Sequence, residues 1–68
     1  MTDDDLVLDL EARRRLRHDL RTPLTIVAGF AEVLAADRPI SDADRQEFAK
    51  RIQDAAADIR RMLDSALE

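Results

Sequence analysis

The sequence has no cysteine, tryptophan or tyrosine, and its 68 residues include one glycine, two prolines and two phenylalanines. Without cysteine no disulfide can staple the fold, and one histidine among scattered carboxylates lacks the ligand spacing of a zinc site. So few turn formers and aromatic residues argue against a sandwich or barrel of many short strands. These absences favour an all-α chain that binds no metal and no cofactor of its own.

Long apolar runs are also missing. A membrane-spanning helix needs about 20 mostly apolar residues, whereas the longest stretch without a charged residue, Thr22–Ala31, has ten. The acidic start of the chain, Asp3 to Asp5, is unlike the basic start of a signal peptide. We therefore expect no direct membrane insertion and a cytoplasmic location, and the sequence leaves open whether the parent protein is anchored in a membrane.

Charged residues make up 38% of the chain, with a formal net charge of −4. Five arginines nevertheless fall between positions 13 and 21. The first four of them surround a helix rather than line one side of it, and no aromatic residue is interleaved with them. We expect no nucleic-acid partner, and we interpret these arginines as a solvated surface or one that attracts an acidic protein.

Apolar residues recur at helical spacing along the first half of the chain. They are Leu6, Leu10, Leu16, Leu20, Leu24, Val27, Ala31 and Leu34. After Leu20 the steps alternate between four and three residues, which is typical of the seam of a helical bundle. We predict a helix over about 6–35, after a disordered acidic segment 1–5. Pro23 predicts a bend rather than a stop, because the period resumes at Leu24.

A second helix is predicted over about 42–67, after a loop over about 36–41. Ser41 is its expected N-cap, with Asp44 as a weak capping-box partner. A seam with the same alternating steps follows: Phe48, Ile52, Ala55, Ile59, Met62 and Ala66. Two helices of similar length with a short connection predict an antiparallel hairpin, and residues 6–68 are expected to form one domain.

A hairpin this small buries too little surface to offset the entropy of ordering its chain. With no disulfide or metal available, association of two copies is the remaining source of stability. The apolar faces are wide enough to contact more than one neighbouring helix. We therefore predict a homodimer in which two hairpins form a four-helix bundle.

His18 lies off the apolar seam, on a helix face with Thr22, Thr25 and Gly29. This face carries no bulky side chain, so the imidazole is accessible to another macromolecule. Imidazole becomes nucleophilic at neutral pH more readily than other side chains, and the adjacent Asp19 could take its proton or hold its tautomer. On composition alone, an exposed histidine most often has no function.

The string from His18 to Leu24, His-Asp-Leu-Arg-Thr-Pro-Leu, closely resembles the phosphoacceptor motif of sensor histidine kinases. The continuation 25–34 also resembles that family's first helix, and residues 41–68 resemble its second helix more loosely. The resemblance implies a dimerisation and histidine-phosphotransfer domain, whose dimer is a four-helix bundle.

Carried over by position, the resemblance implies a role for each residue of the motif. His18 would be phosphorylated at Nε2, and Asp19 would orient the imidazole and accept its proton. Arg21 would position phosphate or contact the kinase domain, Thr22 would orient water for dephosphorylating a response regulator, and Pro23 would supply a bend.

The resemblance also implies partners. ATP and Mg²⁺ would come through an ATP-binding kinase domain, since this chain has one glycine and no nucleotide-binding motif. The phosphoryl group would pass to an aspartate of a response regulator receiver domain. The chain would thus be part of a histidine protein kinase and not a complete enzyme. Two alternatives remain open: a stand-alone phosphotransfer protein and a dimerisation hairpin that has lost phosphotransfer.

Overall fold

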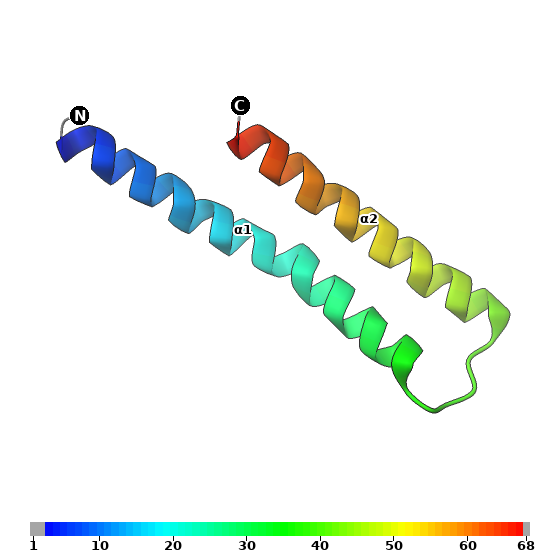
Figure 1. The fold of residues 1–68 in the computed structure, drawn as a ribbon. Helices are drawn as coiled ribbons and strands as arrows, with labels where there is room; N and C mark the ends of the chain where they lie inside the picture. The colour runs from blue at the N-terminus through cyan, green and yellow to red at the C-terminus, as the bar shows by residue number, and fades with distance from the viewer. Residues whose placement is uncertain (1–2, 68) are drawn as a thin grey trace.

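The computed structural model describes the backbone of residues 3–67 and the side chains of residues 9–67. These residues form two helices, α1 (Asp3–Ala35) and α2 (Asp42–Ala66), joined by a loop over 36–41. The helices pack against each other, and the start of α1 and the end of α2 lie away from the loop (Figure 1). The hairpin measures 57 × 19 × 11 Å. The predicted all-α class and the antiparallel hairpin are confirmed.

The helix ends differ slightly from the predicted ones. α1 begins at Asp3, so residues 3–5 are helical rather than part of a disordered segment 1–5, of which residues 1–2 lie outside the described range. Acidic residues in the first turn suit the positive end of the helix dipole, which favours this earlier start. α2 ends at Ala66, and Leu67 is its C-cap, with its N–H donating to the carbonyl oxygen of Leu63.

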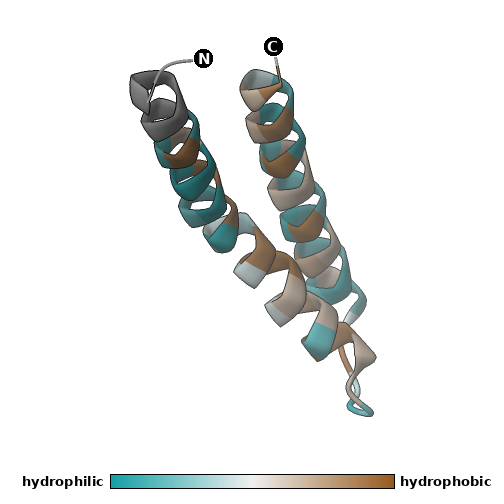
Figure 2. Ribbon diagram, turned by 60° about the vertical axis from the view of Figure 1, so that its left-hand side comes forward, coloured by the Kyte–Doolittle hydropathy of each residue, from teal (hydrophilic) through white to brown (hydrophobic). Residues whose placement is uncertain are grey.

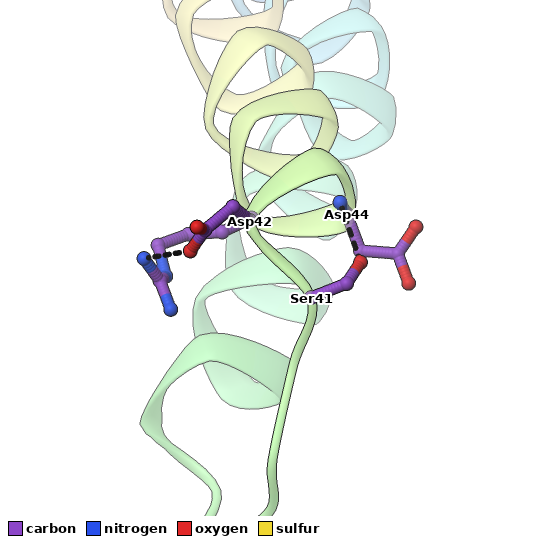
Figure 3. A network of polar contacts seen from close by, with 4 residues as sticks. Ser41, Asp42 and Asp44 are labelled. Carbon is purple, nitrogen blue, oxygen red and sulfur yellow. Dashed lines mark hydrogen bonds and ion pairs between the residues drawn. The ribbon is translucent and has the colours of Figure 1, made fainter.

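Ser41 caps α2, as predicted. Its Oγ accepts a hydrogen bond of 3.1 Å from the backbone N–H of Asp44 (Figure 3). Its carbonyl oxygen accepts one of 2.9 Å from the backbone N–H of Arg45. The neighbouring Asp42 carboxylate accepts a 3.0 Å bond from the Arg45 guanidinium. The bond from Asp44 to the Ser41 Oγ satisfies one of the backbone donors that the first turn of a helix leaves free, so the position where α2 begins is well defined.

The contact line of α1 differs from the predicted seam. Its less exposed side chains recur in steps of four and three: Leu16, Leu20, Pro23, Val27, Phe30 and Leu34. Leu24 and Ala31, which the prediction placed on the seam, are exposed, Leu24 by 52%. The predicted line and the observed line share Leu20, Val27 and Leu34. They differ in the residues between these, and the line through Pro23 and Phe30 is the one that faces α2. On α2 the predicted residues Phe48, Ile52, Ala55, Ile59 and Met62 do form the inner side.

The apolar part of α1 lies toward the loop. Figure 2 shows a mostly hydrophobic α1 near the loop and a mostly hydrophilic one toward the N-terminus, with hydrophobic residues on the side facing α2. α1 continues through Pro23 without interruption, and its ribbon changes direction partway along in this view. Neither helix, as far as it is described, contains an apolar stretch able to cross a membrane.

A single hairpin has almost no interior. Among the described side chains only Pro23 and Ala55 are buried, and no large side chain is fully enclosed. The ion pairs described connect residues of the same helix: Asp9 with Arg13, Asp42 with Arg45, Glu47 with Arg51, and Asp58 with Arg61. Exposed pairs of this kind contribute at most about 1 kcal/mol each. The hairpin therefore needs further burial to be stable.

Candidate functional site

His18 is exposed on α1, at the edge of the groove between the two helices. Its side chain is offset by about 100° from that of Asp19 around the helix, and by about 40° from that of Thr22 one turn later. The side chains of Asp19 and Pro23 lie nearer to α2 than that of His18. His18 therefore lies on the outer side of the groove. The imidazole is thus within reach of another molecule, as the sequence predicted.

An open pocket of about 280 Å³ surrounds this position. Its lining from α1 consists of His18, Asp19, Thr22, Pro23 and Ile26, and its lining from α2 consists of Asp58 and Met62. Four of the five predicted site residues therefore meet in one hollow. The buried ring of Pro23 lies on the inner side, so the pocket has an apolar floor and a polar rim.

Arg21 is the exception among the predicted residues. Its side chain is exposed and does not line the pocket of His18. Three residues after His18, its side chain is rotated by about 60° in the direction opposite to Thr22 and Asp19. Its side chain therefore lies on the other side of His18 from Asp19 and Thr22.

Asp58 and Met62 were missed by reasoning from the sequence motif, which lies on α1 alone. The register of the hairpin, meaning which residues of α1 and α2 lie level with each other, is the information that identifies them. The rings of Phe30 and Phe48 stack with centroids 5.2 Å apart. Counting twelve residues from each phenylalanine away from the loop leads to His18 and Arg60, because antiparallel helices advance at the same rate. The turn of α2 that contains Asp58 and Met62 therefore lies level with His18.

A larger groove continues from this pocket toward the ends of the chain. It has a volume of about 620 Å³ and shares Asp19 and Met62 with the pocket of His18. Its floor is apolar, with Leu16 among the lining residues, and two guanidinium groups lie along it, those of Arg15 on α1 and Arg61 on α2. Glu11 and Asp19 also line this groove, so charges of both signs lie beside its apolar floor next to the histidine.

On the loop side of His18 the surface is shallow and apolar. A hollow of about 290 Å³ is lined by Thr25, Ile26, Gly29, Phe30 and Val33. Ile26 and Val33 are exposed by 39% and 43%. A Cβ atom added at Gly29 would meet no heavy atom within 4 Å. The face of His18 thus continues into an apolar shelf with no bulky side chain at its centre, and we call these five residues the Gly29 shelf.

No group of three or more histidine, cysteine or acidic residues is arranged to hold a metal ion within the described part of the chain. The polar groups of this pocket are the imidazole of His18, the carboxylates of Asp19 and Asp58, and the hydroxyl of Thr22. A nucleophilic nitrogen beside such groups is suited to accepting a small group that arrives on another molecule.

Most of the chain is similar to part of a known protein. The chain is 28% identical over 50 residues to a protein described as sensor histidine kinase YcbM, from Bacillus subtilis (strain 168). The match covers 74% of this chain and 16% of that protein, so the chain spans a small part of its relative. No solved structure matches. The family model described as the His Kinase A (phospho-acceptor) domain matches residues 14–68, which include His18 and all of α2. The chain therefore belongs to the His Kinase A phosphoacceptor domain family.

Proposed function

We propose that this chain is the phosphoacceptor and dimerisation domain of a two-component sensor histidine kinase. His18 receives the γ-phosphoryl group of ATP and passes it to an aspartate of a response regulator. A separate ATP-binding domain supplies ATP and Mg²⁺, and the reaction takes place in the cytoplasm. The observation that carries this proposal is the exposed imidazole of His18 in a pocket with Asp19 and Thr22, within the span of the family match.

Phosphorylation follows from the chemistry of the imidazole. The lone pair of His18 Nε2 attacks the γ-phosphorus, a P–N bond forms, and the bond to the ADP oxygen breaks in line with it. Asp19 is the adjacent carboxylate that can hold the Nδ1 proton and accept it as the ring gains positive charge. In the second step the receiver carboxylate attacks phosphorus, the P–N bond breaks, and His18 is restored with its proton.

A dimer is supported by the apolar residues that the hairpin leaves exposed. Leu24 and Leu63 each follow by one position a residue of the inner side, Pro23 and Met62, and they are exposed by 52% and 40%. In an antiparallel pair the residue after an inner position turns to the same side of the hairpin on both helices. This side lies opposite the face of His18. A second hairpin packed there would supply the missing core and leave the histidine free.

We assign the docking site of the receiver domain to the face of the hairpin that carries His18. The Gly29 shelf adjoins the pocket of His18 through Ile26, which lines both hollows. A partner helix resting on this apolar shelf would hold a receiver aspartate near the imidazole. Apolar patches with a polar rim are typical of protein interaction sites.

The test is phosphorylation by an ATP-binding kinase domain of the same family with radiolabelled ATP and Mg²⁺. We expect label that is lost in acid and kept in base, as a phosphorylated imidazole requires, and none in His18→Gln. Label that persists in His18→Gln would contradict the assignment. No label in the native chain, with a homodimer intact, would favour the alternative of a silent dimerisation hairpin.

A further inference from the structure

The turn of α2 opposite His18 carries an ion pair that the phosphotransfer motif does not include. The Arg61 guanidinium donates a hydrogen bond from Nη2 to Oδ1 of Asp58. Asp58 lines the pocket of His18, whereas Arg61 lines the larger groove that continues from it. The Arg61 guanidinium is thus hydrogen-bonded to Asp58, which lines the same pocket as the imidazole of His18.

Phosphorylation of His18 changes the charge of this pocket. A phosphoryl group on nitrogen carries a charge between −1 and −2 near neutral pH and offers three strong acceptor oxygens, as other phosphorylated side chains do. It would repel the Asp58 carboxylate and attract the Arg61 guanidinium. A guanidinium binds phosphate with two parallel hydrogen bonds, so a phosphoryl group is a better partner for it than one carboxylate oxygen.

The direction of the side chains distinguishes Arg61 from Arg15, the other arginine that lines the larger groove. Long side chains of a helix lean toward its N-terminus. On α1 this direction carries Arg15 away from His18, toward the chain terminus. On the antiparallel α2 it carries Arg61 toward Asp58, at the level of His18. The side chain of Arg61 is 73% exposed and that of Asp58 47% exposed, so neither is locked in place.

We propose that Arg61 is a positioning residue that exchanges Asp58 for the phosphoryl group on His18, while Asp58 acts against the phosphorylated state. This proposal rests on the proposed function, since it requires phosphorylation of His18. Arg61 prolongs the lifetime of the phosphorylated state by partly neutralising the phosphoryl oxygens. Asp58 shortens this lifetime by repulsion and by competing for the guanidinium, which helps the group to leave.

Phosphoramidate provides a test that needs no kinase domain. The Nε2 lone pair of His18 attacks its phosphorus, the P–N bond of phosphoramidate breaks, ammonia leaves, and the Nδ1 proton passes to water. After removal of the reagent, loss of the group is followed by ³¹P NMR. We expect Arg61→Gln to shorten the half-life about twofold to fivefold and Asp58→Asn to lengthen it by a similar factor, the size of couplings between exposed charges. Arg61→Lys should restore part of the lifetime.

The two variants break the same ion pair, which separates a role in positioning from a structural one. Loss of structure alone would move both half-lives in the same direction, whereas the proposal requires opposite directions. Glu47→Gln and Arg51→Gln break a matched pair on α2, with N···O 3.0 Å, that lines none of the hollows around His18, and they should leave the half-life unchanged. Equal or parallel effects of the Asp58 and Arg61 variants would overturn this proposal alone. Failure of phosphoramidate to label the native chain at His18 would overturn the proposed function.

Discussion

Phe30 of α1 and Phe48 of α2 stack with their ring centroids 5.2 Å apart and their planes inclined by 28°. This contact joins the helices near the loop, where α1 is most apolar. It fixes the register of the hairpin, and through that register it determines which residues of α2 lie level with His18. The aromatic pair and the phosphoacceptor site are therefore linked, although they lie more than three helical turns apart.

A double-mutant cycle on Phe30 and Phe48 should detect this link. Each Phe→Ala change removes apolar contact at the loop end, and we expect a loss of about 2 kcal/mol in the free energy of unfolding, below the cost at a fully buried site because both rings are only half-buried. The coupling between the two changes should be about 0.5–1.5 kcal/mol, as for other aromatic pairs. Urea unfolding followed by circular dichroism at one fixed protein concentration measures both quantities. Strictly additive effects would contradict a stacking contribution.

The predicted dimer face can be tested with one aspartate on each side of the hairpin. Leu24→Asp places a charge among the apolar residues opposite the site, so we expect the dimer to dissociate and the helices to lose stability. Ile26→Asp places the same charge on the face of His18 and should leave the dimer intact. Sedimentation at micromolar concentration distinguishes these results.

Ile26→Asp is a matched control for Leu24→Asp because both side chains are exposed in the hairpin, Leu24 by 52% and Ile26 by 39%. A native chain that sediments as a monomer, or a dimer lost only in Ile26→Asp, would contradict the bundle.

The sequence predicted the two helices, the loop and the cap at Ser41, because each depends on local spacing and on one residue type at one position. It placed Leu24 on the contact line in error, because the apolar face of α1 is wider than one line and both lines satisfy the same period. Pro23, treated as a bend, is in addition one of the two residues that are buried among the side chains of 9–67. Periodicity describes how apolar a face is, whereas the packing partner decides which row of that face is covered.

The sequence predicted the part of the candidate site that lies on α1 and missed the part that lies on α2. The motif on α1 identified His18, Asp19 and Thr22, which do line one pocket. It could not identify Asp58 or Arg61, because their proximity to His18 depends on the register across the loop and not on a pattern along either helix.

Asp19 and Thr22 should affect different steps. Asp19→Asn removes the carboxylate that can take up the Nδ1 proton, so the rate of His18 phosphorylation should fall about tenfold to a hundredfold, within the range for a general base. Thr22→Ala keeps that carboxylate and should leave phosphorylation within about twofold, while dephosphorylation of the receiver, for which water must be oriented, is slowed. Single-turnover labelling and loss of label from the receiver separate the two steps. An equal loss of phosphorylation in both variants would argue against distinct roles.

Gly29 offers a test in which stability and function move in opposite directions. Glycine in a helix costs about 1 kcal/mol relative to alanine, and a Cβ added here would meet no atom within 4 Å. We therefore expect Gly29→Ala to raise the free energy of unfolding by up to about that amount, measured in urea. Gly29→Leu should also keep the fold, yet its side chain would fill the Gly29 shelf and slow phosphotransfer to the receiver by about tenfold or more. Labelling of His18 by ATP should stay unchanged in both variants, since the imidazole is not covered. Phosphotransfer at the native rate in Gly29→Leu would mean that the receiver docks elsewhere, because no docked helix could share this hollow with a leucine side chain.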